Sequence, residues 1–239
     1  MIARMLSDLQ ESINGRRRVY LVRHGNVSYF DERGKPYDQD SVPLDQEGVV
    51  QAKALGRCLD PLAIDRLVVS GLPRTVETAE LVAAGRELKL EMHQGLREIS
   101  PGPLADIPRE DLEREFTMSL SGDLSRQTRF LGGETFGSLE DRVLACLRTL
   151  LEDTDWNSLL IVAHGGTNRI ILGHALGAGL RGAGTIEQDP ACLNIVDVNR
   201  DGTFVVRLLN YTPGSPAKDG LHLTTMEAIY MKYLADGRE

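Results

Sequence analysis

Short apolar segments alternate with helical patterns along this 239-residue chain, and this alternation constrains the fold more than any other feature. Strands are predicted over 18–23, 66–69, 87–92, 158–163, 192–198 and 203–210. Helices are predicted over 45–59, 73–84, 108–118, 138–151, 167–177 and 225–234. Strands that alternate with helices build a parallel sheet covered by helices. The sequence therefore predicts an α/β fold with a mostly parallel central sheet.

The whole chain, residues 1–239, is predicted to form a single domain, because no repeat or linker interrupts the pattern. A short amphipathic helix is expected over about 2–14, where apolar residues recur at helical spacing. The C-terminal tail, about 211–239, is expected to carry the helix 225–234. This helix would pack on the domain or on a second subunit, so a homodimer is left open.

Charge and hydropathy exclude several classes of protein. The formal net charge of -8 disfavours nucleic-acid binding, which depends on a basic surface. No apolar run reaches the roughly 18 residues that span a membrane, and the N-terminus lacks the apolar core of a secretory signal. Cys58, Cys146 and Cys192 match no metal spacing and are expected to be small buried apolar residues. We therefore expect a cytoplasmic protein without a membrane or nucleic-acid partner.

Three predicted strands end in residues that suit an anion site. The segments that follow these strands are Arg23–Gly25, Ser70–Gly71 and His164–Gly166. Ligands of open α/β sheets bind beyond the carboxyl ends of the strands. Glycine-rich turns and helix N-termini also offer backbone N–H groups to anions. The pattern predicts an anion site that contains two histidines and at least one arginine.

Such a set of residues suits phosphoryl transfer. A neutral imidazole is a nucleophile near pH 7. Arginine forks match the three equatorial oxygens of a phosphoryl group, so cations and donors matter more here than a metal. A carboxylic acid must also protonate the departing alkoxide. The sequence should then supply a nucleophilic histidine, a second histidine, arginines and one acid.

Several segments with these residues occur in a fixed order over about residues 18–200. They are Val19–Gly25, Leu44–Ala52, Ser70–Ala79, Leu96–Ile99, Gly132–Thr135 and Ala163–Gly166. In this order they resemble the motifs of the histidine phosphatase superfamily, in its phosphoglycerate-mutase-like branch. The resemblance implies a three-layer sandwich with helices on both faces of the sheet.

The resemblance also implies roles for the matched residues. His24 would take the phosphoryl group, while Arg23, Arg74 and His164 would hold its oxygens. Glu98 would protonate the leaving oxygen and then activate water. No metal and no organic cofactor is implied.

One departure from the family pattern follows Arg-His-Gly. Many relatives carry Glu or Gln there and then Thr or Ser, whereas this chain has Asn26 and Val27. An amide can still hydrogen-bond phosphate, so Asn26 is a candidate substrate ligand together with Gly165, which lies in the glycine-rich turn before a predicted helix. Glu134 is a candidate substrate contact, although a solvated loop charge is the favoured interpretation. The departure leaves the substrate subclass open.

Hydrolases, mutases and silent binding proteins all occur in the family. A mutase needs a second basic anion site, and Arg109 and Arg114 are set among acidic residues. We therefore expect a phosphomonoester hydrolase that acts on a small phosphorylated metabolite. A phosphoglycerate-type phosphomutase, a protein phosphatase and a phosphate-recognition regulator are the alternatives.

Two long segments, 26–43 and 100–137, are expected to cover the pocket and so to favour a small substrate. Both contain aromatic residues that are candidates for its walls. These residues are Tyr29, Phe30, Phe130 and Phe136. An apolar or ring-bearing leaving group is therefore left open.

Overall fold

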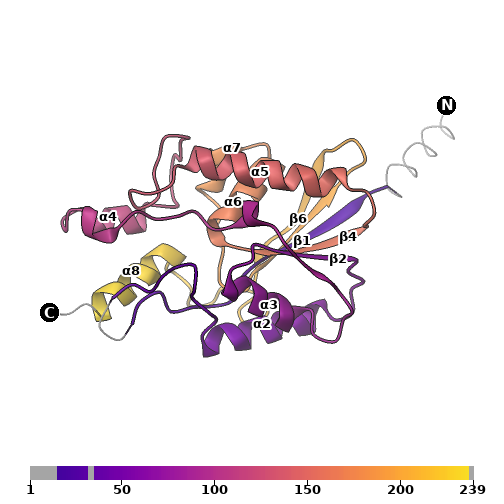
Figure 1. Cartoon of the computed structure of the whole chain (residues 1–239), viewed down its shortest axis with the longest axis horizontal. Coiled ribbons are helices and arrows are strands. Elements are labelled where there is room, and N and C mark those ends of the chain that lie inside the picture. The colour runs from indigo at the N-terminus through magenta and orange to yellow at the C-terminus, as the bar shows by residue number, and fades with distance from the viewer. Residues whose placement is uncertain (1–14, 32–34, 237–239) are drawn as a thin grey trace.

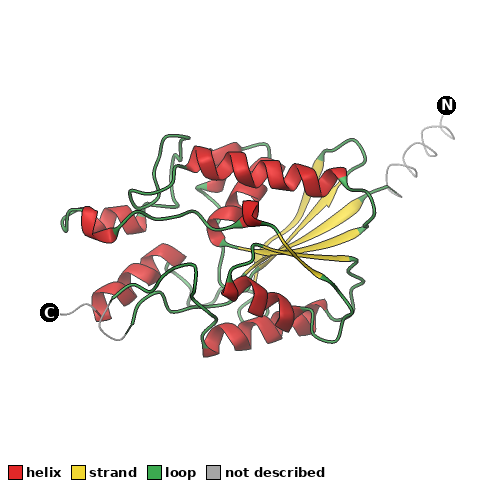
Figure 2. Ribbon diagram, in the orientation of Figure 1, coloured by secondary structure: helices red, strands yellow, loops and turns green. Residues whose placement is uncertain are grey.

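The computed structural model describes residues 15–31 and 35–236. Its centre is a six-stranded sheet in the order β3-β2-β4-β1-β5-β6, and Figure 2 shows helices on both sides of it. The strands are β1 (Arg17–Arg23), β2 (Arg66–Val69), β3 (Leu90–Met92), β4 (Ser158–Ala163), β5 (Leu193–Val198) and β6 (Phe204–Tyr211). The helices are α2 (Gln46–Leu59), α3 (Pro73–Val82), α4 (Leu112–Thr117), α5 (Phe136–Glu152), α6 (Gly165–Ala175), α7 (Gly179–Ala183) and α8 (Thr225–Asp236).

The sheet is mostly parallel. Strand β4 pairs in parallel with β1 on one side and with β2 on the other, and β2 pairs in parallel with β3. Strands β5 and β6 form an antiparallel hairpin, and β5 also runs antiparallel to β1. The predicted α/β class with a mostly parallel central sheet is therefore confirmed.

Alternating side chains of the strands contribute to two apolar cores, and helices cover both faces of the sheet (Figure 1). Val19 and Leu21 of β1 belong to a core that contains residues of α5 and α6. Tyr20 and Val22 belong to the other core, with residues of α2 and α3. Successive residues of a strand point to opposite faces of the sheet, so the short apolar run of β1 contributes side chains to both cores. This confirms the predicted three-layer sandwich.

Two helices begin earlier than predicted. Helix α5 starts at Phe136 because the Thr135 hydroxyl accepts the Ser138 N–H and caps the helix. The helix predicted to begin at 138 therefore begins two residues earlier. Helix α6 starts at Gly165 rather than at 167, with His164 as its N-cap residue.

Other predicted elements are shorter than expected. The strand 87–92 is reduced to β3, and the helix 108–118 to α4, because the Asp111 N–H closes a turn on the Pro108 carbonyl. The five-residue helix α7 was not predicted, since it is too short for a periodic pattern. Cys192 is buried, but Cys58 is exposed, so the expected burial of Cys58 is wrong.

The C-terminal helix packs on the chain itself. Helix α8 contacts α4, with the ring of Phe116 5.5 Å from Tyr230 and 5.8 Å from Tyr233. Both helices lie beyond the carboxyl ends of the parallel strands (Figure 1). The helix predicted over about 2–14 lies outside the described residues. None of the helices within 15–31 and 35–236 is long and apolar enough to cross a membrane.

Candidate active site

The parallel pairing brings both motif histidines to one edge of the sheet. Arg23 of β1 pairs with Ala163 of β4, so His24 and His164 follow at the same level. The His24 N–H donates to the Ala163 carbonyl at 3.0 Å. The two imidazole rings lie 5.2 Å apart between centroids, with an interplanar angle of 64°. The third predicted segment, which begins at Ser70, follows β2 on the other side of β4.

His24 is held as a neutral imidazole. Its Nδ1 lies 2.7 Å from the Gly25 carbonyl, which assigns the ring proton to Nδ1 because a carbonyl only accepts. Nε2 is buried and finds no hydrogen-bond partner in the described part of the chain. Burial, followed by the charges of Arg74 and Arg23, holds the pKa of His24 well below its ordinary value. The free lone pair on Nε2 therefore persists at neutral pH.

His164 is oriented by a hydroxyl chain. Its Nε2 lies 2.8 Å from Ser70 Oγ, which lies 3.0 Å from Thr75 Oγ1. The Thr75 hydroxyl donates to the Leu72 carbonyl, so the Ser70 hydroxyl donates to Thr75 Oγ1 and we assign the ring proton to His164 Nε2, which donates to Ser70 Oγ. Nδ1 then carries the lone pair of the neutral ring, and it is buried with no partner among the residues described. Burial and the charge of Arg74 lower the pKa of His164 well below its usual value.

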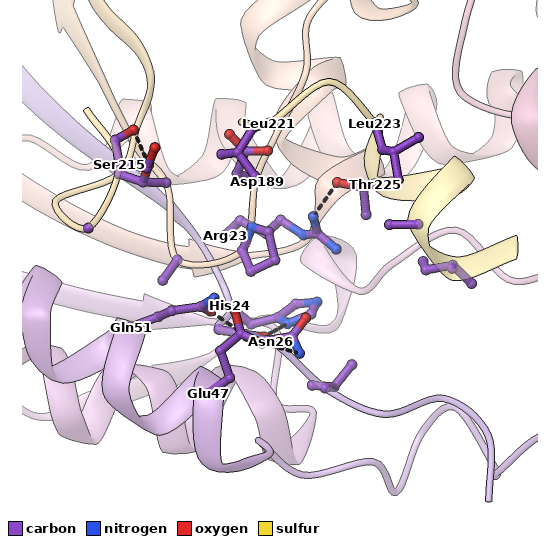
Figure 3. A pocket seen from close by; sticks show the side chains of 18 of the residues that line it. Arg23, His24, Asn26, Glu47, Gln51, Asp189, Ser215, Leu221, Leu223 and Thr225 are labelled. Atoms are coloured by element: carbon purple, nitrogen blue, oxygen red, sulfur yellow. Dashed lines mark hydrogen bonds between the residues drawn. The ribbon is translucent and has the colours of Figure 1, made fainter. Parts of the chain in front are cut away.

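Each of the two predicted arginines has one guanidinium nitrogen in hydrogen bonds with the protein and at least one nitrogen without a partner. Arg23 Nη1 donates to the Gln188 carbonyl at 2.6 Å and to Thr225 Oγ1 at 3.0 Å, the second bond being visible in Figure 3. Arg74 is fully buried, and its Nη1 donates to the Gln39 carbonyl at 2.6 Å. Arg23 Nε, Arg74 Nε and Arg74 Nη2 have no partner in the described structure. These open N–H groups suit the oxygens of an anion.

A third arginine, Arg169 on α6, was not predicted. Its Nη2 pairs with Glu187 at 2.8 Å, whereas Nη1 is buried without a partner within the described ranges. A Cβ atom on Gly165 would lie 3.4 Å from Arg169 Nη1 and 3.5 Å from Arg23 Nε. The two guanidinium groups therefore end beside the same glycine. The sequence offered one signal for Arg169. It lies four residues after Gly165, a spacing that places the two residues on the same face of a helix.

Glu98 is held at the N-terminus of α6. Its Oε2 accepts the Gly166 N–H at 3.0 Å, and its Oε1 accepts the Thr167 N–H at 3.3 Å. The Ile99 N–H also donates to Oε1, at 3.0 Å. The positive end of the helix dipole and these three donors fix the carboxyl group in place.

The loop that carries Glu98 is braced from α5. Arg142 donates to the backbone carbonyls of Arg97 and Glu98 at 2.6 and 2.9 Å. The same guanidinium pairs with Glu134 at 2.9 Å, and Glu134 accepts the Ser100 N–H at 3.1 Å. Glu134 is therefore a partner of the acid loop, and its prediction as a solvated charge is wrong.

Asn26 is described at the site by its side chain, and Gly165 by its backbone N–H. The Asn26 side chain lies beside His24 (Figure 3), where its amide nitrogen donates to Asp45 Oδ2 at 2.7 Å. Gly165 is buried and opens α6, so its N–H falls outside the hydrogen bonds of the helix. A role for either residue in binding phosphate stays a prediction.

Two cavities meet at Arg23. Cavity 1 has a volume of about 590 Å³ and is lined by His24 and Asn26, among others. Cavity 2 has a volume of about 400 Å³ and is lined by Glu98, Gly165 and Arg169, among others. Arg23 lines both cavities, as do Thr225 and Ile229 of α8.

The two long segments do border these cavities, as predicted. Tyr29 and Phe30 line both cavities, and Phe130 lines cavity 2. Phe136, the fourth aromatic candidate, is instead buried in the core under α5. Within 15–31 and 35–236, no group of three or more His, Cys, Asp or Glu side chains is arranged to hold a metal ion.

Known proteins resemble this chain in sequence and in fold. "Probable phosphoglycerate mutase GpmB" of Salmonella paratyphi A is 35% identical over 152 residues, which are 62% of this chain and 69% of that protein. The structure of α-ribazole phosphatase from Shigella flexneri superposes with a TM-score of 0.65 at 24% identity, covering 81% of this chain and 96% of the other.

A second solved structure shows the same fold. Phosphoserine phosphatase from Entamoeba histolytica, in complex with 3-phosphoglyceric acid, gives a TM-score of 0.63 at 18% identity and covers 82% of this chain and 98% of its own. Residues 19–212 of this chain match the histidine phosphatase superfamily, branch 1. This range contains each of the predicted catalytic residues, and the chain belongs to the histidine phosphatase superfamily.

Proposed function

We propose that this protein hydrolyses a phosphomonoester of a small metabolite through a phosphohistidine on His24. The observation that carries the proposal is a set of buried nitrogen atoms that lack partners among the described residues. These atoms are His24 Nε2, His164 Nδ1, Arg23 Nε, Arg74 Nε and Arg74 Nη2. Unpaired buried polar atoms are costly. A bound phosphoryl group would accept hydrogen bonds from the arginine nitrogens, and His24 Nε2 supplies the lone pair that would attack phosphorus.

In the first step, His24 Nε2 forms a bond to phosphorus while the phosphorus–oxygen bond of the ester breaks. Arg23 and Arg74 donate hydrogen bonds to the equatorial oxygens, where negative charge is spread in the transition state, and His164 donates from Nδ1 in the imidazolium form that the bound anion stabilises. Glu98 gives its proton to the departing oxygen, which leaves as an alcohol.

In the second step, the Glu98 carboxylate accepts a proton from a water molecule. The water oxygen bonds to phosphorus, and the nitrogen–phosphorus bond breaks with its electron pair returning to His24 Nε2. Phosphate leaves, and Glu98 is protonated again. The backbone donors around Glu98 keep the carboxyl group in one position through both steps.

The charge distribution favours a hydrolase over a mutase, although the Salmonella relative is named for a mutase. A bisphosphate-primed mutase must hold a second phosphate with further cations. Arg109 is exposed, and Arg114 pairs with Asp111 and Glu115 on the protein surface. These arginines are therefore a poor second phosphate site.

Hydrolysis of p-nitrophenyl phosphate in EDTA tests the proposal directly. The activated leaving group lowers the demand for Glu98, so the assay reports the nucleophile and the phosphate site. We expect metal-independent turnover that falls by roughly three orders of magnitude or more in His24→Ala. His174→Ala is the matched control, because His174 is exposed on α6 and should leave the rate unchanged.

Retained turnover in His24→Ala, or complete loss of wild-type activity in EDTA, would contradict the mechanism. A requirement for a bisphosphate primer, with no phosphate released, would instead identify a mutase. Rapid turnover of phosphoproteins without turnover of small esters would identify a protein phosphatase.

A further inference from the structure

The two cavities separate the attacking nitrogen from the acid. His24 lines cavity 1, Glu98 lines cavity 2, and Arg23 lies between them. In phosphoryl transfer the attacking and leaving atoms lie roughly in line on opposite sides of phosphorus. A phosphoryl group at Arg23 that is attacked from His24 therefore releases its alcohol into cavity 2.

Much of the lining of cavity 2 is apolar. It is built from segments that are far apart in the sequence. Its apolar side chains are Phe30, Leu104, Phe116, Leu120, Phe130, Leu131, Met226 and Ile229. Phe116 also packs on Tyr230, and Phe30 lies 5.4 Å from Tyr233, so helix α8 fixes the wall from outside. A preformed apolar wall of this kind favours an apolar ligand.

The charges around cavity 2 disfavour a second anionic group on the substrate. Among the described residues that line it, the cations are Arg23 and Arg169, which both end beside Gly165 at the phosphate site. Besides Glu98, the carboxylates that line it are Asp38 and Asp40, both exposed, and Asp40 pairs with Arg97 at 3.1 Å. Beyond these two arginines, an acidic group on the alcohol would meet only carboxylates among the charged residues described along the lining.

We propose that cavity 2 is the leaving-group site and that it selects phosphomonoesters of apolar, uncharged alcohols. The inference rests on the proposed function and names the substrate class of the same site. Burial of the alcohol against the apolar lining supplies binding energy. Glu98, which also lines cavity 2, protonates the leaving oxygen of the ester.

A series of n-alkyl phosphates from ethyl to hexyl tests this substrate class. The leaving alcohols have nearly the same acidity, so the series varies buried apolar surface alone. We expect kcat/KM to rise about fourfold for each added methylene until the cavity is full, which is the factor that one buried CH₂ group provides. A carboxylate at the end of the hexyl chain should cancel most of this gain.

Variants of residues that line one cavity or the other test which cavity causes the chain-length dependence of kcat/KM. Leu104→Asn and Met226→Gln place polar groups in cavity 2, and they should flatten the chain-length dependence while ethyl phosphate is still hydrolysed. Turnover of ethyl phosphate also reports that each variant is folded. Leu221→Asn is the matched control, since Leu221 lines cavity 1 alone and should leave the dependence unchanged.

The possible failures are distinguishable. A wild-type series with no dependence on chain length, or a dependence that Leu221→Asn alone abolishes, would overturn the assignment of cavity 2 and leave the proposed hydrolysis standing. The absence of turnover for every ester, including p-nitrophenyl phosphate, would overturn the proposed function itself.

Discussion

The contact between Gly166 and Glu98 predicts that one added methyl group disables the acid. A Cβ atom at position 166 would lie 2.6 Å from Glu98 Oε1, whereas ordinary contacts of this kind are roughly 3.5 Å. In Gly166→Ala the carboxyl group must therefore retreat by roughly 1 Å. The helix itself tolerates the change, because alanine is a better helix former than glycine by about 1 kcal/mol.

The cost to catalysis follows from that displacement. Moving away stretches the bonds that Glu98 Oε1 accepts from Ile99 and Thr167. A reacting group misplaced by about 1 Å costs about 100-fold in rate, or about 2.7 kcal/mol of transition-state stabilisation. We expect this loss for alkyl phosphates, whose alkoxide leaves poorly without a proton.

The assay compares two esters with the same enzyme preparations. For p-nitrophenyl phosphate, which leaves readily, Gly166→Ala should stay within a few-fold of the wild type. Glu98→Gln is the reference variant and should show the same selective loss, and urea unfolding should show that Gly166→Ala is at least as stable as the wild type. Equal losses on both esters, or no loss on the alkyl ester, would refute the role assigned to this contact.

Two further predictions concern the cations and the histidines of the site. Burial and the arginines hold the pKa values of His24 and His164 below the unfolded value of about 6.5, so the unfolded chain takes up protons first as the pH falls. The free energy of unfolding should therefore decrease by about 2–3 kcal/mol between pH 7.5 and 5.5 in urea titrations, and His24→Gln should halve that decrease; an equal pH dependence in both proteins would contradict this. Arg169→Lys keeps a charge beside Glu187 but loses the planar fork, so the inhibition constant for inorganic phosphate should rise about tenfold. Arg181→Lys, on the protein surface, is the control, and the same constant in both variants would show that Arg169 does not reach phosphate.

The sheet could be predicted from sequence because its central strands are buried on both faces. Leu159, Leu160, Ile161 and Val162 of β4 form a continuous apolar run, which is typical of a parallel strand. Helix ends were less predictable, because contacts distant in sequence decide them. The Phe136 N–H donates to the Thr128 carbonyl, so the preceding loop fixes the first turn of α5 at a position that local sequence does not specify.

The site was predictable where its residues directly follow strands. His24 directly follows β1 and His164 directly follows β4, and the parallel register of these strands brings the two histidines together. Arg169 was missed because a cation within a helical pattern looks like an ordinary surface residue until its burial is known. The contribution of α8 was missed because no local pattern links Thr225 to Arg23.

The hydrogen bond from Arg23 to Thr225 joins residues 202 positions apart. During synthesis on the ribosome, β1 and its arginine emerge long before α8 does. A growing chain can thus hold both histidines, Arg74 and Glu98 while the guanidinium of Arg23 has the Gln188 carbonyl but still lacks its second anchor, Thr225. The activity of the proposed site would then appear late, when the end of the chain docks, and a protease cut between β6 and α8 would remove it while leaving the sheet intact.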